Sequence, residues 1–386
     1  MQFKTKLLHT HYAADNSTGA LTTPIYQSST FAYGSAEDGR ARFAGEQPGF
    51  IYSRMANPTV QALEYQLAQL EGADEALVVA SGMAAISSIF YALASQGDEI
   101  AFIDPVYGGT AAFLIQTLTR AGITVRRYQD DDHLLAEINA KTKIILFEPI
   151  TNPTLKVSDY RKVKRAAEKV GAITICDNTF LTPYLFKPLE HGIDIVMHSA
   201  TKYLSGHGDL IAGVVAGPKA LMQPIRTIAL KHIGAAIGPQ EAYLLQRGLR
   251  TLALRMDAHL AGAAKVAAFL ATHPSVAKVY YPGLADDQGH QVLSETINAF
   301  GGMVSIELKG GFNRAAQFLD HLNLFTQAVS LGDLESLACH PASTTHAAMD
   351  AASRLASGVN DNLIRLSIGV EDPQDLIADL EQALAI

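Results

Sequence analysis

The sequence predicts an α/β protein in which a mainly parallel sheet lies between helices, followed by a smaller C-terminal α+β domain. From Glu75 onwards, apolar strands alternate with helical segments, and most strands are continuous apolar runs of the kind buried on both faces. After about residue 237 the pattern changes to a long helical stretch and then short strands. A chain of 386 residues is also too long for one ordinary core, which favours two domains.

Residues 1–56 show no sustained helical or strand period, and we interpret them as an arm that contacts a neighbouring subunit. The turn at Asn57-Pro58 then leads into a helix expected over Val60–Leu70. Residues 57–250 are expected to form the large domain. Its predicted strands are Ala76–Val79, Glu99–Ile103, Thr124–Tyr128, Lys143–Phe147, Ile173–Cys176 and Ile195–Met197.

Residues 251–386 are expected to form the small domain. The helical stretch that begins at Gly238-Pro239 and runs through Leu270 enters it, with interruptions expected near Gly248 and Gly262. Short strands are predicted at Val276–Tyr281, Met303–Leu308 and Leu363–Ile368, and a last helix follows Pro373.

Composition excludes several classes of function. The formal net charge is -8 and the basic residues are scattered, so no nucleic-acid partner is expected. The sequence contains no apolar run long enough to span a bilayer, and no membrane partner is expected. Two cysteines, Cys176 and Cys339, make no disulfide framework, which together with the absence of an apolar signal core indicates a cytoplasmic protein. Cys176 lies within an apolar strand and is expected to be inert packing. His340 and His346 lack the helical spacing of a zinc site, so no metal is predicted.

The residues that could take part in catalysis or ligand binding follow the predicted strands. Lys202 comes just after the strand that ends near Ser199, and a lysine in a cleft becomes a nucleophile when its pKa falls below the usual value of about 10.4. Asp177 ends another apolar strand, where it is either a helix cap or the partner of a protonated ring nitrogen. Taken alone, Lys202 is equally consistent with a surface lysine.

A phosphate site is predicted beside these two residues. Ser81-Gly82-Met83 opens a helix, whose free amides and dipole favour an anion, and Ser199 and Thr201 add two hydroxyl groups. Either element alone is typical of an ordinary helix cap. A lysine, an aspartate and a phosphate site together match the requirements of pyridoxal 5'-phosphate (PLP).

Motifs along nearly the whole chain resemble the cysteine/methionine metabolism (trans-sulfuration) family of PLP-dependent enzymes, the γ-subfamily of fold type I. The resemblance implies an aspartate-aminotransferase-like fold and is closest to cystathionine γ-lyases and methionine γ-lyases. The matching segments are Tyr52-Ser-Arg54, Ala80-Ser-Gly-Met83, Tyr107-Gly-Gly-Thr110, Asp177-Asn-Thr179, Ser199-Ala-Thr-Lys-Tyr-Leu-Ser-Gly-His207, Ser330-Leu-Gly332 and Leu363-Ile-Arg-Leu-Ser367.

The resemblance also implies roles for single residues. Lys202 would carry PLP as a Schiff base and then move the Cα proton, while Tyr107 would stack on the ring and act as acid and base on the leaving group. Arg365 would bind the substrate carboxylate, with Asn152 and Ser330 assisting. From the residues alone, Tyr107 is equally a core tyrosine and Arg365 a surface strand residue. The implied cofactor-binding set is Tyr52, Arg54, Ser81, Gly82, Met83, Tyr107, Asp177, Thr179, Ser199, Thr201 and Lys202.

Tyr52 and Arg54 would reach the site of a neighbouring subunit, which implies a catalytic dimer and, as in this family, a tetramer built from two dimers. The substrate is expected to be a small amino acid.

The resemblance leaves the exact reaction open among related chemistries. Gly109 and the segment Phe147–Lys156 are similar to cystathionine γ-lyases, and His232 departs from the acidic residue of methionine γ-lyases, whereas Val329 matches methionine γ-lyases. We expect a cystathionine γ-lyase-like carbon-sulfur lyase with some β-elimination, which releases hydrogen sulfide when cysteine is the substrate. The alternatives are a methionine γ-lyase, a cystathionine γ-synthase or O-acylhomoserine sulfhydrylase, and a non-catalytic regulator with this fold.

Overall fold

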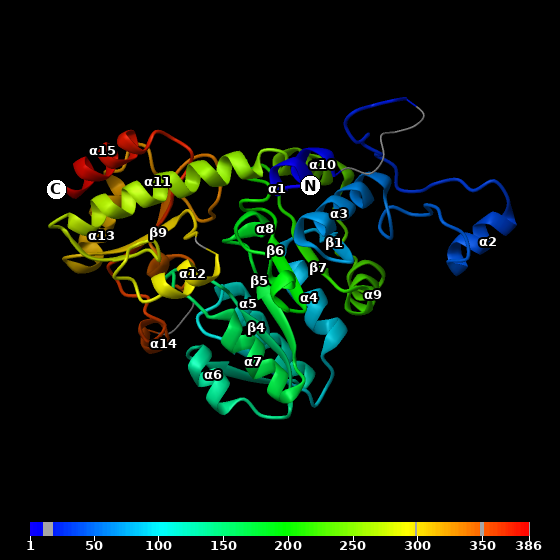
Figure 1. The fold of residues 1–386 in the computed structure, drawn as a ribbon, viewed down its shortest axis with the longest axis horizontal. Helices are drawn as coiled ribbons and strands as arrows, with labels where there is room; N and C mark the ends of the chain where they lie inside the picture. The colour runs from blue at the N-terminus through cyan, green and yellow to red at the C-terminus, as the bar shows by residue number, and fades with distance from the viewer. Residues whose placement is uncertain (11–17, 298, 348–350, 386) are drawn as a thin grey trace.

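In the computed structural model, which describes residues 1–10, 18–297, 299–347 and 351–385, a seven-stranded sheet forms the centre of the large domain (Figure 1). Its strand order is β1-β7-β6-β5-β4-β2-β3. Neighbouring strands from β6 to β3 are parallel, and β7 runs antiparallel to both β1 and β6. The predicted mainly parallel sheet is thereby confirmed. The strands are β1 (Glu75–Val79), β2 (Glu99–Ile103), β3 (Thr124–Tyr128), β4 (Thr142–Phe147), β5 (Ile173–Asp177), β6 (Ile195–Ser199) and β7 (Gly213–Gly217).

Both faces of this sheet are covered, which explains the continuous apolar strands. In β1, Leu77 and Val79 pack into one core with helices α4 and α9, while Ala76 and Val78 pack into a second core with α3, α7 and α10. The helices of this domain are α3 (Pro58–Glu71), α4 (Gly82–Leu93), α5 (Gly108–Ala112), α6 (Asp131–Glu137), α7 (Tyr160–Val170), α8 (Thr182–Leu185), α9 (Lys219–Arg226) and α10 (Pro239–Leu249), with π-helical turns η1 (Phe113–Leu118) and η4 (Thr227–Ile233).

The C-terminal part contains a second sheet of order β10-β11-β12-β9-β8, antiparallel except for the β10-β11 pair. Val266 of α11, Phe318 of α13 and Leu380 of α15 belong to the core on this sheet. This is the predicted α+β domain. Its elements are α11 (Leu252–Thr272), β8 (Val276–Tyr280), α12 (His290–Thr296), β9 (Met303–Leu308), α13 (Gly311–Asp320), β10 (Thr326–Gln327), β11 (Leu337–Cys339), α14 (Ala351–Ala356), β12 (Leu363–Ser367) and α15 (Pro373–Leu384).

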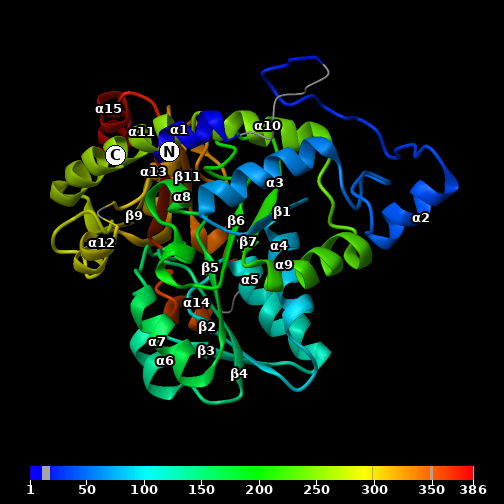
Figure 2. The ribbon, with the colours of Figure 1, turned by 45° about the vertical axis from the view of Figure 1, so that its right-hand side comes forward.

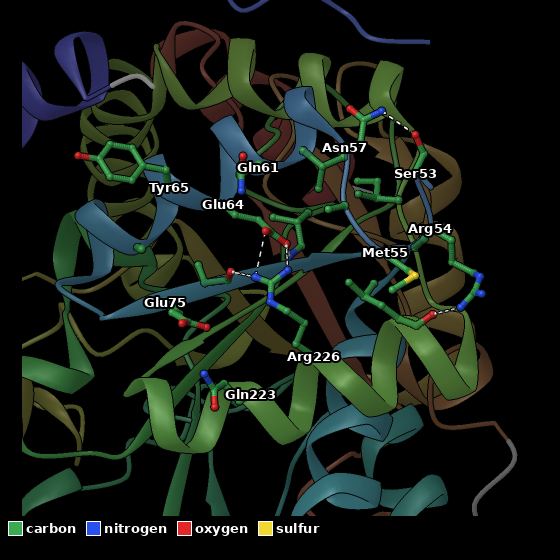
Figure 3. A pocket seen from close by; sticks show the side chains of 18 of the residues that line it. Ser53, Arg54, Met55, Asn57, Gln61, Glu64, Tyr65, Glu75, Gln223 and Arg226 are labelled. Atoms are coloured by element: carbon green, nitrogen blue, oxygen red, sulfur yellow. Dashed lines mark hydrogen bonds and ion pairs between the residues drawn. The ribbon is translucent and has the colours of Figure 1, made fainter. Parts of the chain in front are cut away.

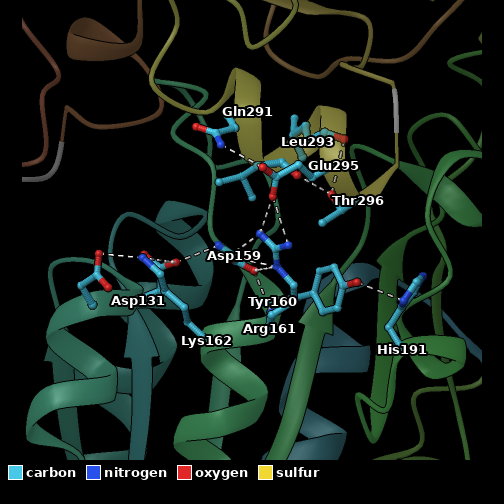
Figure 4. A network of polar contacts seen from close by, with 12 residues as sticks. Asp131, Asp159, Tyr160, Arg161, Lys162, His191, Gln291, Leu293, Glu295 and Thr296 are labelled. Carbon is cyan, nitrogen blue, oxygen red and sulfur yellow. Dashed lines mark hydrogen bonds and ion pairs between the residues drawn. The ribbon is translucent and has the colours of Figure 1, made fainter.

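The two sheets are joined by helices and by polar contacts. Helices α10 and α11 run in succession along one side of the molecule, from the large domain to the small one (Figures 1 and 2). Arg161, at the start of α7, forms ion pairs with Asp159 at 2.9 Å and with Glu295 of α12 at 3.2 Å (Figure 4). Ser305 of β9 also donates a 2.6 Å hydrogen bond to the carbonyl of Pro153. These contacts connect strand-end loops of the large domain to the small domain.

The N-terminal segment is more regular than predicted, because the described part of residues 1–56 contains two helices. Helix α1 (Phe3–His9) packs on α3, where Gln66 donates to the carbonyl of Leu7 at 2.9 Å. Helix α2 (Ala36–Ala44) begins at Ser35, whose hydroxyl accepts from the Asp38 amide, and ends at the left-handed Gly45. Tertiary contacts and caps therefore form helices that periodicity did not indicate. Helix α2 projects away from the rest of the chain (Figures 1 and 2).

Two further expectations need correction. Helix α11 runs without a break through Gly262, where an added Cβ would lie 3.0 Å from Ile368, so this glycine serves close packing instead of a break. The predicted break near Gly248 is present, since α10 ends at Leu249 and α11 begins at Leu252. Strand β7, which is short and bounded by glycines, was not predicted.

Among the described residues, no helix combines the length and the apolar character needed to cross a membrane.

Candidate active site

One cavity of about 560 Å³ lies where the strand-end loops of the large sheet face the small domain. Loops after β1, β2, β4, β5 and β6 supply its large-domain side, as expected for a sheet of this topology. The small domain supplies residues before and after β11 and on β12. Predicted site residues that line the cavity are Ser81, Gly82, Met83, Tyr107, Asn152, Asp177, Thr179, Ser199, Thr201, Lys202, Ser330 and Arg365.

Lys202 lies in the turn that follows β6, partly buried in this cavity. Its Nζ donates a 2.7 Å hydrogen bond to the hydroxyl of Ser330. Burial, and next the positive charge of Arg365, lower the pKa of the Lys202 amine, while Asp333 opposes the shift. The site therefore shifts the lysine towards its neutral, nucleophilic form.

The turn that carries Lys202 is held by Arg255, a buried residue of α11. Arg255 donates to the carbonyl oxygens of Tyr203 at 2.7 Å and Gly248 at 2.9 Å. Gly206 ends the turn with a φ of +69°, and a Cβ there would overlap the Arg255 guanidinium. A small-domain helix thus positions the lysine of a large-domain loop.

We expect Arg255→Met to lower the free energy of unfolding by about 3 kcal/mol, because it leaves buried carbonyl groups without donors. Chemical denaturation followed by circular dichroism measures this change. Arg250→Met is the matched control, since Arg250 is exposed in the nearby turn between α10 and α11. Equal stability of the two variants would contradict the role assigned to Arg255.

Asp177 ends β5 and accepts hydrogen bonds from the Thr179 hydroxyl at 2.5 Å and the Thr179 amide at 3.1 Å. Burial raises the pKa of the Asp177 carboxyl, while the Thr179 hydrogen bonds and the positive potential of His198 oppose that rise. A partly buried carboxylate of this kind is stabilised by a cation. The position therefore suits a protonated ring nitrogen.

The start of α4 offers an anion site. Ser81 caps the helix, and its hydroxyl accepts a hydrogen bond from the Ala84 amide at 3.0 Å. The amides of Gly82 and Met83 have no acceptor within the helix, because they lie in its first turn. A Cβ at Gly82 would lie 2.9 Å from the Cβ of Ser199, which shows how closely the helix start approaches the strand end. Thr201 is fixed beside them, because its hydroxyl accepts from the Ala212 amide at 3.0 Å.

Arg365 lies on β12 and is buried. Its terminal nitrogens donate to the Asn152 side-chain oxygen at 2.9 Å and to the Ser330 carbonyl at 2.7 Å. The Nε of Arg365 is also buried and has no hydrogen-bond partner among the described residues. Ser330 adopts a positive φ of 92°, which lets its carbonyl bond Arg365 while its hydroxyl bonds Lys202. The guanidinium thus has N–H groups left for a carboxylate.

Sequence reasoning missed Glu148, Thr344 and Thr345, which also line the cavity. Glu148 directly follows β4, so the strand-end pattern that indicated Asp177 contained the signal for it. The two threonines follow β11 on the small domain and carry no comparable signal. Only the packing of the small domain against the sheet brings them to the site.

Tyr52 and Arg54 do not line this cavity in their own chain. Arg54 lines a second cavity, of about 540 Å³, between α3 and α9 (Figure 3). There it donates to the carbonyl of Leu230 at 2.6 Å, while Arg226 pairs with Glu64 at 3.0 Å. The structure therefore separates these two predicted phosphate ligands from the other members of the set.

PLP fits the residues of the larger cavity. The amides of Gly82 and Met83 at the start of α4 suit its phosphate, the partly buried Asp177 suits its ring nitrogen, and the lowered pKa of Lys202 suits a bond to its aldehyde. Cys176, next to Asp177, is fully buried, and burial raises the pKa of its thiol well above the usual value. The burial of Cys176 agrees with the expectation that it serves as packing, and its lack of reactivity stays a prediction.

Comparisons with known proteins agree with this geometry. The model of the family described as Cys/Met metabolism PLP-dependent enzyme matches residues 4–385. The chain is 46% identical over 385 residues to an L-methionine gamma-lyase of Pseudomonas putida, covering 99% of this chain and 97% of the relative. It is 44% identical over 384 residues to a cystathionine beta-lyase of Lactococcus lactis subsp. cremoris, covering 99% and 98%.

Solved structures superpose closely on this chain. A cystathionine gamma-lyase from Lactobacillus plantarum, complexed with L-serine, has a TM-score of 0.94 and 42% identity, with 100% of this chain and 99% of the other covered. A putative O-acetylhomoserine (thiol)-lyase of Campylobacter jejuni has a TM-score of 0.95 and 35% identity, with both chains fully covered at 100%, and carries a pyridoxyl-lysine phosphate. The predicted fold type and cofactor are confirmed, and the chain is an enzyme of the carbon-sulfur lyase type. It belongs to the Cys/Met metabolism family of PLP-dependent enzymes.

Proposed function

We propose that this enzyme cleaves L-cystathionine by γ-elimination, which with water gives L-cysteine, 2-oxobutanoate and ammonia. β-Elimination from cystathionine or cysteine is the expected side reaction. The observation that carries the proposal is the cavity that joins Lys202, Tyr107 and Arg365. Its volume of about 560 Å³ leaves room for a long amino acid beside the cofactor. The similarity to cystathionine lyases of both kinds supports this assignment.

The roles of the residues follow from their positions. Bound PLP would supply an electron-withdrawing ring that stabilises negative charge at the substrate Cα. Lys202 takes the Cα proton in its neutral form, which burial favours. Arg365 binds the substrate carboxylate, and Asn152 and Ser330 hold the guanidinium from behind. Asp177 keeps the ring nitrogen protonated, and Tyr107 donates a proton to the leaving sulfur.

The same proposal includes the assembly. Because Tyr52 is 44% exposed and lies outside the cavity of its own chain, we propose that Tyr52 and Arg54 complete the site of a second copy. The projecting α2 segment supports such a contact, and a tetramer would pair two of these dimers (Figure 1).

We also propose a cytoplasmic location. Cys176 and Cys339 are both free, in keeping with this proposal.

Methionine is the second candidate substrate, because apolar side chains line part of the cavity. Val329 is 56% exposed and Ile211 is 65% exposed, and both line the cavity. Apolar side chains at these positions favour the binding of a substrate with an uncharged distal group over one with a charged distal group. The similarity to methionine gamma-lyases supports this candidate. The non-catalytic alternative is set aside, because the chain belongs to a family of enzymes.

A substrate panel tests the proposal. Oxoacid release is measured with cystathionine, methionine, homocysteine and O-acetylhomoserine plus a thiol, and cystathionine is expected to give the highest kcat/KM. Oxoacid release from methionine alone would assign the enzyme to the second candidate, and replacement without oxoacid would assign it to the synthases.

Val329→Glu is expected to shift the ratio of kcat/KM for cystathionine over methionine upwards by roughly tenfold. The added carboxylate would attract the distal ammonium group of cystathionine and disfavour an apolar methyl group. Val329→Leu, which keeps the apolar character, is the matched control and is expected to leave the ratio nearly unchanged. A ratio that does not respond to the glutamate would show that Val329 does not contact the distal group.

A further inference from the structure

Glu148 carries a buried carboxyl group in the cavity, and the proposed reaction does not use it. It directly follows β4, is 6% exposed and lines the cavity together with Tyr107 and Asn152. A carboxyl group is costly to bury unless hydrogen bonds compensate. Its contacts therefore indicate what it does.

The contacts of Glu148 are with the backbone of two site residues. Its Oε1 accepts a 2.6 Å hydrogen bond from the Tyr107 amide, and the Asn152 amide faces the same carboxyl group. Tyr107 belongs to the loop after β2, and Asn152 to the loop after β4. One side chain thus joins the residue proposed to protonate the leaving group to a residue that holds Arg365.

Tyr107 depends on such a contact for its position. Its side chain is 45% exposed, and the described residues offer its hydroxyl no hydrogen bond. The helix that follows, α5, is only five residues long, and the Tyr107 side chain does not cap it. The position of the Tyr107 side chain therefore depends on how its backbone is held.

We propose that Glu148 is a positioning residue that holds Tyr107 relative to Asn152, by accepting a hydrogen bond from the Tyr107 amide on the carboxyl group that the Asn152 amide faces. The inference rests on the proposed roles of these two residues. It does not depend on which amino acid is the preferred substrate. All candidate substrates share the carboxylate that Arg365 is proposed to bind, and all would use Tyr107 as the acid-base group.

The competing explanation is electrostatic. Burial first, and then the neighbouring Asp177, raise the pKa of the Glu148 carboxyl well above its usual range, and Asp104 adds to this effect. Glu148 would then act on the site through its charge or its proton. The two explanations differ in what matters: a positioning residue needs the length of the side chain, and an electrostatic residue needs the ionisable group.

Two substitutions separate these explanations. Glu148→Gln keeps the length and an oxygen for the Tyr107 amide but removes the ionisable group. Glu148→Asp keeps the ionisable group but is one methylene too short to reach both amides. We expect Glu148→Asp to lower kcat and to raise KM, each by roughly tenfold, and Glu148→Gln to stay within about threefold of the wild type.

A binding measurement gives a readout other than turnover. Glycine, which has a carboxylate but no leaving group, is titrated into the holoenzyme while the visible absorbance of PLP is followed. Its Kd is expected to rise roughly tenfold in Glu148→Asp and to stay near the wild-type value in Glu148→Gln.

Glu99→Asp is the matched control. Glu99 is also buried, and shortening it would break side-chain hydrogen bonds to Thr142 at 2.9 Å and Asn139 at 2.7 Å, but Glu99 does not line the cavity. The variant is expected to lose thermal stability without the changes in kcat, KM and glycine binding. The same kinetic changes in Glu99→Asp would overturn the inference, because they would follow from general loss of packing.

The remaining outcomes are equally decisive. A normal Glu148→Asp enzyme, or a Glu148→Gln enzyme impaired as strongly as Glu148→Asp, would overturn the positioning role. Tyr107→Phe and Asn152→Ala separate this failure from a failure of the proposed function. If both of these variants keep normal kcat and KM, the proposed roles are wrong; if they are impaired while Glu148→Asp is normal, only the inference about Glu148 is wrong.

Discussion

Replacing Lys202 with alanine is expected to abolish the visible absorbance of lysine-bound PLP and to lower kcat by at least about a thousandfold. In the proposed mechanism the Lys202 amine is both the attachment point of the cofactor and the base for the Cα proton, so one change would remove two functions. Its position is fixed by the 2.7 Å hydrogen bond to Ser330 and by the Arg255 contacts behind the turn. Absorbance spectra and oxoacid release measure the two losses.

Lys202→Arg and Lys265→Ala serve as controls for this prediction. The arginine variant keeps a positive charge beside Ser330 but cannot attach PLP covalently, so it is expected to be as inactive as the alanine variant. Lys265 is exposed on α11, and its alanine variant is expected to behave like the wild type. An arginine variant with normal turnover would show that Lys202 contributes only charge.

Arg365→Lys is expected to raise KM by roughly ten- to a hundredfold while changing kcat much less. A lysine keeps the charge, but its three N–H donors cannot bind a carboxylate with two parallel hydrogen bonds while they also bond both Asn152 and Ser330. The loss is expected to fall on substrate binding, because Arg365 is proposed to bind the substrate carboxylate and not the reacting carbon. Steady-state kinetics with cystathionine and with methionine measure it, and both substrates are expected to be affected equally.

Arg120→Lys provides the matched control, since Arg120 is exposed in the large domain, away from the cavity. It is expected to leave KM unchanged. If Arg365→Lys changes KM for cystathionine but not for methionine, then Arg365 binds the distal carboxylate of cystathionine instead of the carboxylate that both substrates share, and the proposed substrate orientation is wrong.

The strand-end pattern explains why so much of the site could be predicted. A buried parallel strand requires apolar residues on both faces, and Leu77 to Val79 in β1 show this plainly. The first polar residues after such a strand then mark the edge of the sheet where ligands bind. Asp177 and Lys202 were found in this way. Glu148 follows the same rule but was not predicted.

Contacts that depend on distant parts of the chain were not predictable in this way. Strand β7 is short and bounded by glycines, and it becomes a strand because β1 and β6 both pair with it. Helix α11 tolerates Gly262 because Ile368 packs against the bare backbone. In both cases a weak local preference is overridden by packing that the local sequence does not reveal.

Six of the seven strands of the large sheet, the cofactor chemistry and many residues of the site could be predicted, because burial and strand ends impose local patterns on the chain. Which of these residues contact one another depends on tertiary packing. Arg255 reaches the turn of Lys202, Glu148 accepts a hydrogen bond from the Tyr107 amide, and Thr345 enters the cavity from the small domain. These contacts link residues far apart in the chain, and their strength depends on exact distances and burial, which the order of amino acids does not show.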